Sequence, residues 1–231
     1  MLPLDIAITT DIANIEAMLA RKSILNRPTV KALLALTKTR CTASDHALRP
    51  PVLPKVIRRL NPMLVSADKL KLLLPDGLRY VVVGGVASAH YQPARFTEDI
   101  DLMVLAEDAT AVEHALQLAG WSQLGIISFG GSSWQSAEGE LIDLLHAPEQ
   151  SWVTAALDAP IKTLEGLQII DLPYLIILKL SATRAVDIGD IVSMLQHAAE
   201  DETVRIRQAV ETHRSDLLED FEQFNEIARL S

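Results

Sequence analysis

The stretch that decides the fold is YVVVGGVASAHYQPARFTEDIDLMVL, residues 80–105. Its two ends, residues 80–83 and 102–105, are short apolar runs with the length and composition of buried strands. Gly84 and Gly85 end the first run, where the backbone can turn tightly into a helix and leave N–H groups that face a phosphate. The pattern predicts a unit of strand, turn, helix and strand.

Two carboxylates stand at the start of the second predicted strand. Because side chains alternate along a strand, Asp99 and Asp101 point to one side and Ile100 points to the other. Ionised groups held this close repel each other and lose hydration, and a divalent cation would remove that cost. A third acid, Asp143, lies between aliphatic residues in another predicted strand, residues 140–145.

Length and composition set the broad class of the protein. The chain of 231 residues is 49% hydrophobic, so it can bury a core as one large domain or two small ones. The single cysteine excludes an internal disulfide and a thiolate metal site. The longest apolar run, residues 172–180, contains Lys179 and is too short to span a bilayer, and no signal-like segment is present. We expect a cytoplasmic protein without membrane contact.

The net charge of −9 conceals two different parts. Residues 1–79 hold 13 Lys and Arg against 6 Asp and Glu, whereas residues 80–231 hold 8 against 24. All ten aromatic residues also lie at or after Tyr80. The acidic total disfavours tight non-specific binding of nucleic acid, but the basic segment could contact phosphates locally.

The hydrophobic pattern predicts a mixed α/β (α+β) fold with three parts. These are a basic helical segment (residues 1–77), an α/β core (78–170) and a C-terminal helical region (171–231). Predicted helices cover residues 11–24, 29–39, 56–60, 67–74, 107–118, 186–197 and 204–224, and predicted strands cover 121–129, 133–135 and 140–145. Asp171 is expected to cap a further apolar helix that carries Lys179 and is interrupted near residues 181–185.

Taken together, these residues resemble the nucleotidyltransferase superfamily with the DNA polymerase β-like fold. The resemblance rests on Gly84-Gly85, the Asp99-Ile-Asp101 strand and the further strand acid Asp143. A narrower similarity is to the AbiEii-type nucleotidyltransferases, which are toxins of bacterial toxin–antitoxin or phage-defence pairs. It rests on the local sequence pattern around Arg95-x-Thr97, the Lys179 helix and residues 184–190. The resemblance covers roughly residues 78–198 and implies a mixed β-sheet core flanked by helices.

The resemblance also implies a role for each site residue. The acids would hold Mg²⁺ or Mn²⁺ beside a nucleoside triphosphate, with the third acid also taking the proton of the acceptor hydroxyl. The implied metal ligands are Asp99, Asp101 and Asp143, and the implied catalytic residues are these three and Lys179. The implied nucleotide-binding residues are Gly84, Gly85, Ser88, Arg95, Asp187 and Asp190. The superfamily often has Gly-Ser at the turn, and here Ser88, one helical turn after the turn, is the available hydroxyl.

Plainer interpretations of several residues stay open at this point. Lys179 could be a lysine that reaches solvent along an apolar helix, with Asp187 and Asp190 as ion-pair partners. Arg95 could neutralise the acid pair when no metal is bound. The three tryptophans fit the core, although Trp134 could instead stack on a base. Either Asp187 or Asp190 could be the downstream site acid.

The resulting functional expectation is a metal-dependent nucleotidyltransferase that moves a nucleoside monophosphate from an NTP to a hydroxyl. The resemblance implies RNA, such as a tRNA 3′ end, as one acceptor, and an antitoxin protein as one partner. Two alternatives remain. The same chemistry could act on a small molecule or a protein side chain, or the domain could bind a nucleotide or a partner without catalysis.

Overall fold

The computed structural model describes residues 64–127, 130–163 and 165–230. The helices predicted over residues 11–24, 29–39 and 56–60, and most of the basic N-terminal segment, lie outside the described residues. Within the described part, the first helix is α4 (Ala67–Leu73), close to the predicted residues 67–74. Ser66 caps it, since the Ser66 hydroxyl accepts a hydrogen bond from the Lys69 N–H.

A mixed seven-stranded sheet forms the centre of the described molecule, in the order β3-β4-β5-β2-β1-β7-β6. Three strands, β1 (Val81–Val83), β2 (Asp99–Leu105) and β5 (Leu141–Ala147), occupy its middle. β2 pairs antiparallel with β1 and parallel with β5. The expected mixed α/β core is therefore confirmed.

The outer strands complete the sheet on both sides. β3 (Ser122–Ile126) and β4 (Gly131–Gln135) form an antiparallel pair beside β5, and β6 (Ile161–Lys162) and β7 (Gln168–Ile169) lie beyond β1. β3 is shorter than the predicted strand over residues 121–129 and is exposed along its length. Trp134 on β4 is 1% exposed and donates its indole N–H to the Ser132 hydroxyl. It belongs to the core, so the alternative of base stacking is wrong.

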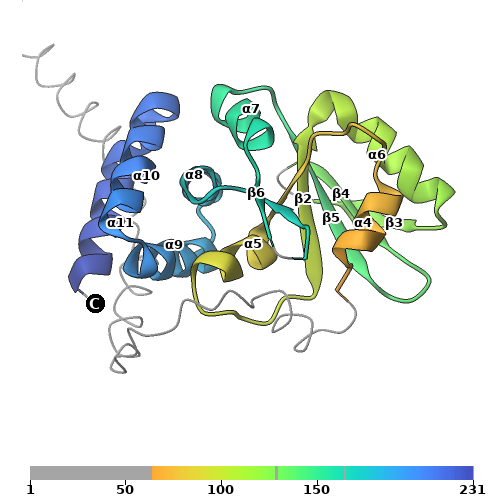
Figure 1. Cartoon of the computed structure of the whole chain (residues 1–231), viewed down its shortest axis with the longest axis horizontal. Coiled ribbons are helices and arrows are strands. Elements are labelled where there is room, and N and C mark those ends of the chain that lie inside the picture. Colours follow the sequence, from red (N-terminus) through yellow and green to blue (C-terminus); the bar gives the residue numbers. More distant parts are fainter. Residues whose placement is uncertain (1–63, 128–129, 164, 231) are drawn as a thin grey trace, which may run out of the picture.

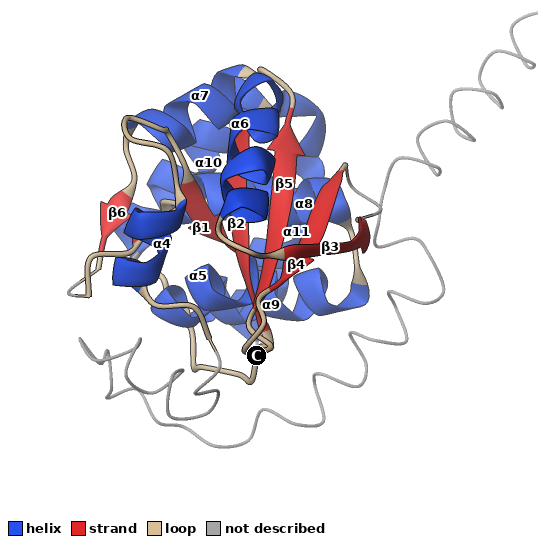
Figure 2. Cartoon of the chain, turned by 90° about the vertical axis from the view of Figure 1, so that its right-hand side faces the viewer, coloured by secondary structure: helices blue, strands red, loops and turns tan. Residues whose placement is uncertain are grey.

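Two helices follow directly from the central strands. α5 (Gly84–Tyr91) begins where β1 ends, and α6 (Ala106–Leu118) begins where β2 ends. α5 contacts β1 and β2, whereas α6 contacts β2 and β5. In Figure 2 the strands lie in front of α5, α8 and α9, so one face of the sheet is covered by helices from two distant parts of the sequence.

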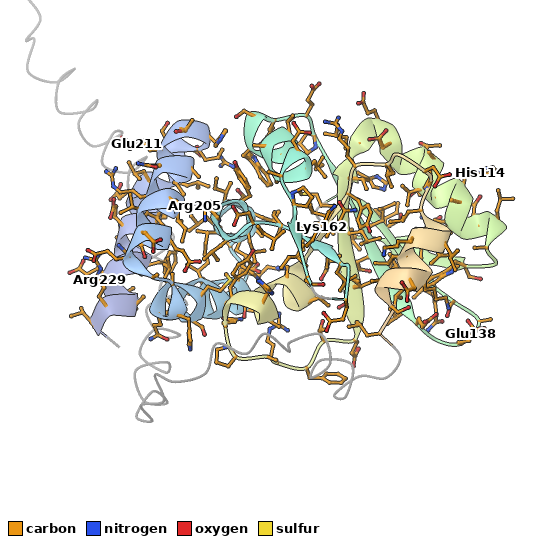
Figure 3. All side chains as sticks on the ribbon, viewed as in Figure 1. His114, Glu138, Lys162, Arg205, Glu211 and Arg229 are labelled. Carbon is orange, nitrogen blue, oxygen red and sulfur yellow. The ribbon has the colours of Figure 1, made fainter. Side chains whose placement is uncertain are left out.

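The C-terminal helices pack as a group at one end of the molecule (Figure 1). The group contains α8 (Leu172–Ala182), α9 (Ala185–His197), α10 (Glu200–His213) and α11 (Leu218–Leu230), and α7 (Ser151–Asp158) contacts α8 and α10. The predicted single helix over residues 204–224 is wrong, because a 3-10 turn, Ser215–Leu217, separates α10 from α11. Figure 3 shows Arg229 of α11 at one end of the molecule and Glu138, which lies in the turn that joins β4 to β5, at the opposite end.

The α8 helix begins and ends as the sequence predicts. The Asp171 carboxylate caps it by accepting the Leu172 N–H at 2.8 Å, and a proline lies in its first turn. It ends at Ala182, and its C-cap is Thr183, a β-branched residue in the left-handed region at φ 56°. The predicted interruption before α9 is thus confirmed. No helix among the described residues is long and apolar enough to cross a membrane.

Candidate active site

Three carboxylates meet where β1 ends and β2 and β5 begin. The parallel register of β2 and β5 places Asp101 directly beside Asp143, and Asp99 lies two residues earlier on the same face of β2. One carboxylate oxygen from each of the three residues lies within 4.8 Å of the others. We call Asp99, Asp101 and Asp143 the acid triad. The sequence predicted its members, and the sheet register brings them together.

The electrostatics of the acid triad favour a cation. Burial, followed by repulsion from Asp99 and Asp143, raises the pKa of Asp101 to about 7. Burial also raises the pKa of Asp143, although the Ser133 hydrogen bond opposes this rise. Among the described residues, none of the ion pairs involves an acid of the triad. Hard oxygen ligands of this kind fit Mg²⁺ or Mn²⁺, so the residues present suit a divalent cation.

The turn at Gly84 and Gly85 lies against the acid triad. Gly84 has φ +60°, and a Cβ at this position would lie 1.7 Å from the Asp101 Oδ2. The Gly85 N–H favours the ionised form of the Asp101 carboxylate. The first N–H groups of α5 therefore point at the site, and glycine at position 84 is required by both its conformation and this close approach.

Ser88 occupies a different environment from the one predicted. Its side chain is fully buried, and its hydroxyl donates a hydrogen bond of 2.8 Å to the Gly84 carbonyl. This arrangement holds the first turn of α5. Such burial disfavours direct contact between the Ser88 hydroxyl and a phosphate.

Lys179 forms a buried ion cluster with the two downstream aspartates. Its Nζ lies 3.0 Å from Asp187 Oδ1 and 2.8 Å from Asp190 Oδ2, and the lysine side chain is 3% exposed. The alternative in which Lys179 reaches solvent is therefore wrong. Both aspartates, rather than one of them, pair with the lysine, because α9 presents positions 187 and 190 on one face.

Two residues that follow α5 complete the environment of Asp190. Gln92 donates its Nε2 to Asp190 Oδ1 at 2.8 Å, and Arg95 approaches the same carboxylate at 3.3 and 3.4 Å. Burial opposes ionisation of Asp190, but the charge of Lys179 and the hydrogen bonds from Lys179, Gln92 and Arg95 lower its pKa overall. Arg95 thus neutralises Asp190, whereas the sequence left open that it neutralises Asp99 and Asp101.

Arg184 is part of the same cluster, although the sequence suggested no role for it. Its Nε donates to Asp187 Oδ2 at 2.7 Å, and its Nη2 lies 3.2 Å from Asp187 Oδ1. The Asp187 hydrogen bond raises the pKa of Arg184, and the charge of Arg184 in turn favours ionisation of Asp101. The ion cluster, which we define as Arg95, Lys179, Arg184, Asp187 and Asp190, therefore acts electrostatically on the acid triad.

Arg95 brings the ion cluster close to the turn. A Cβ at Gly85 would lie 3.5 Å from Arg95 Nη2 and 2.8 Å from Thr97 Oγ1. The guanidinium of Arg95 is thus a neighbour of the first residues of α5, whose N–H groups face the acid triad. The acid triad, the α5 N-terminus and a cation of the ion cluster form one continuous site.

Sequence reasoning missed four residues of this site: Gln92, Thr97, Ser133 and Arg184. Thr97 and Arg184 lie inside the segments that carry the family resemblance, so their positions in the sequence could have identified them as site residues. Gln92 and Ser133 carried no local signal, because their partners Asp190 and Asp143 are 98 and 10 residues away along the chain.

Comparisons with known proteins add little to this geometry. No family model matches the chain, and no curated protein matches it. Solved structures that match include the antibiotic-resistance factor ANT(2″)-Ia in solution, with 16% identity over 76% of this chain and 90% of that chain, at a TM-score of 0.37. They also include the crystal structure of ANT(2″)-Ia in complex with adenylyl-2″-tobramycin, with 15% identity over 76% and 96%, at a TM-score of 0.39. Since both scores lie below 0.5, fold and function are judged from the geometry of this chain.

Proposed function

We propose that this protein is a divalent-metal-dependent nucleotidyltransferase, which transfers a nucleoside monophosphate from an NTP to a hydroxyl group. The observation that carries the proposal is the acid triad beside the N-terminus of α5. Three convergent carboxylates suit divalent cations, and helix N–H groups suit phosphates. A nucleoside triphosphate bound with its cations is a ligand that needs both.

The acid triad would hold the cations through Asp99, Asp101 and Asp143. Bound there, Mg²⁺ or Mn²⁺ would neutralise the triphosphate and stabilise the charge on the attacking and leaving oxygens. Asp143 is the residue we assign as general base. Its carboxylate belongs to the acid triad, so it would lie beside the α-phosphorus that the acceptor hydroxyl attacks. The acceptor oxygen bonds to the α-phosphorus, its proton passes to Asp143, and pyrophosphate leaves.

The ion cluster would help bind the triphosphate, chiefly through Arg95. The Arg95 side chain is 41% exposed, and its hydrogen bonds to Asp190 are long, at 3.3 and 3.4 Å. Asp190 keeps shorter bonds from Lys179 and Gln92, both of 2.8 Å. Arg95 can therefore turn toward a phosphate without leaving Asp190 unpaired. Lys179, Asp187 and Asp190 would fix the position from which Arg95 acts.

The acceptor is the finer part of the proposal. We propose RNA, such as a tRNA 3′ end, as one acceptor, with an antitoxin protein as the partner that restrains the enzyme. The basic balance of residues 1–79 supports this acceptor. The acidic balance of residues 80–231 favours a second candidate, transfer to a small molecule or a protein side chain, because an acidic body repels a polyanion.

A labelled-transfer assay tests the proposal. The full chain is incubated with each α-labelled NTP, Mg²⁺ and, separately, total RNA, a metabolite extract and a protein extract. We expect label in one acceptor class and release of pyrophosphate. Asp99→Ala is expected to abolish both, whereas Asp76→Asn, an exposed aspartate in a turn, should behave as the parent does.

Two results would contradict the proposal. The first is absence of transfer to every acceptor class. The second is transfer by Asp99→Ala at the parental rate. NTP binding that does not depend on a divalent cation, without transfer, would favour a domain that binds nucleotide without catalysis.

A further inference from the structure

We infer that the hydroxyls of Thr97 and Ser133 are positioning groups, which fix the orientation of two of the three cation ligands. The inference rests on the proposed function in one respect, namely that the acid triad binds a divalent cation. It concerns residues for which the family resemblance gave no role. The contacts of Thr97 and Ser133 to the acid triad indicate this positioning role.

Thr97 holds Asp99. The threonine lies in the segment between α5 and β2 and is 7% exposed. Its Oγ1 lies 3.1 Å from Asp99 Oδ1, and because an ionised carboxylate only accepts hydrogen bonds, the hydroxyl is the donor. This bond restricts rotation of the Asp99 carboxylate.

The Thr97 side chain is itself fixed by packing. A Cβ at Gly85 would lie 2.8 Å from Thr97 Oγ1 and 3.1 Å from Thr97 Cβ, so the threonine occupies the space beside the Gly85 backbone. The Gly85 N–H in turn favours ionisation of the Asp101 carboxylate. Thr97 therefore sits between the turn and the acid triad.

Ser133 does the same for Asp143 from the neighbouring strand β4. β4 and β5 pair antiparallel with Ser133 opposite Asp143, and the Ser133 hydroxyl donates to Asp143 Oδ1. Cross-strand neighbours in this register have their side chains on the same face. Asp99 and Asp143 thus each receive a hydrogen bond from a neutral hydroxyl group, that of Thr97 or that of Ser133.

Neutral donors suit ligands of a cation better than charged donors do. A lysine or arginine at these positions would orient the carboxylate but would also cancel the charge that attracts the cation. A hydroxyl orients the carboxylate and leaves its charge in place. Hydrogen-bond partners of metal ligands typically contribute about 10- to 100-fold in metal affinity, which is the size of effect that we expect here.

Titration of the full chain with Mn²⁺, followed by the electron paramagnetic resonance signal of the free ion, tests the inference without relying on activity. Thr97→Val keeps the shape of the side chain and removes the donor, so we expect Mn²⁺ to bind about tenfold more weakly. Thr97→Ser restores the donor and should bind as the parent does. Ser133→Ala should weaken binding to a similar degree.

Two controls separate this inference from the proposed function. Thr203→Val removes a hydroxyl that bonds to the Ala199 carbonyl on α10, and it should leave Mn²⁺ binding unchanged. Asp99→Asn should lose binding. If Asp99→Asn loses binding while Thr97→Val and Ser133→Ala bind as the parent does, the inference is overturned and the metal site stands. If Asp99→Asn binds Mn²⁺ as the parent does, the metal site fails and the inference fails with it.

Folding of Thr97→Val is checked by its circular dichroism spectrum and thermal transition. Should this variant not fold, the comparison of Ser133→Ala with the parent decides the matter. Parental affinity in Ser133→Ala then overturns the inference, and a loss of about tenfold supports it.

Discussion

The acid triad and the ion cluster are neighbouring groups of acids that differ in their partners. In the ion cluster, Asp187 and Asp190 each contact Lys179, and arginines provide further contacts. In the acid triad, the identified hydrogen-bond donors are the hydroxyls of Thr97 and Ser133. The acids of the ion cluster are thus neutralised by cations of the chain, whereas the identified donors to the acid triad are neutral, as a cation site requires.

The pKa values follow this difference. Burial and mutual repulsion raise the pKa of Asp101, while in the ion cluster the charge of Lys179 and its hydrogen bonds outweigh burial and lower the pKa of Asp190. Burial acts in the same direction on both residues, so the partners decide the outcome. The comparison indicates that the ion cluster stabilises the structure of the site, whereas the acid triad is suited to bind a ligand.

The largest expected effect follows from breaking the ion cluster. Lys179→Met leaves two buried carboxylates with fewer partners, and we expect the free energy of unfolding to fall by about 3 kcal/mol. Urea unfolding measures it. Lys162→Met provides the control, since Lys162 lies exposed on the short strand β6 (Figure 3). A loss in Lys179→Met no larger than in Lys162→Met would show that the ion cluster does not hold the site together.

The pH dependence of stability is expected to differ between the two groups. The raised pKa of Asp101, about 7, means that the folded state binds its proton more tightly than the unfolded state, whose value is near 4. The stability that this tighter proton binding gives the folded state is fully present at pH values below the unfolded pKa. It is lost as the pH rises through 7. Without divalent metal, we expect stability to fall by about 2 kcal/mol between pH 5 and pH 8.

The ion cluster has the opposite dependence, because the lowered pKa of Asp190 gives stability that is lost only as pH falls below its ordinary range. The window from pH 5 to pH 8 therefore separates the acid triad from the ion cluster. His90, whose pKa is lowered by burial, gives a slope of the opposite sign in this window, so the difference between the slopes with and without Mg²⁺ reports on the acid triad. Urea unfolding at several pH values, with and without Mg²⁺, measures the slope. Mg²⁺ should flatten it, and a slope that is unchanged by Mg²⁺ would contradict the assignment.

The smallest expected effect concerns Arg95, which belongs to the ion cluster but is held by long hydrogen bonds. Arg95→Gln should raise the KM for the NTP about tenfold, which corresponds to about 1.4 kcal/mol, and change the free energy of unfolding by less than about 0.5 kcal/mol. Steady-state kinetics and urea unfolding give both values. Arg79→Gln, which removes an exposed ion pair with Asp158, is the control. A large loss of stability with an unchanged KM would instead make Arg95 a structural residue.

Much of the core was predictable from local sequence. Asp99, Asp101 and the turn at Gly84 are close together in the chain, and strand alternation and glycine conformation set their geometry directly. The cap at Asp171 and the break near Thr183 are local in the same way. Joining Asp143 to the acid triad needed the family resemblance, because strand pairing across 42 residues is not encoded in a local pattern.

Several side chains have contacts that the local sequence did not indicate. The sequence offered Ser88 as a phosphate contact, but a serine on a helix can donate to the carbonyl four residues earlier, and Ser88 does so. It left open whether Asp187 or Asp190 is the site acid, and the new start of the helix at Ala185 lets both reach Lys179. The roles of Ser133 and Gln92 depend on packing between elements, which hydrophobic periodicity does not report.

Urea unfolding of Asp101→Asn at pH 8 tests most directly the claim that the acid triad waits for a divalent cation. The amide removes a charge that the folded state tolerates poorly, so without divalent metal we predict that the variant is about 2 kcal/mol more stable than the parent. Added Mg²⁺ should then stabilise the parent and leave the variant unchanged. A variant that is less stable than the parent without metal, or that gains as much from Mg²⁺, would contradict the claim.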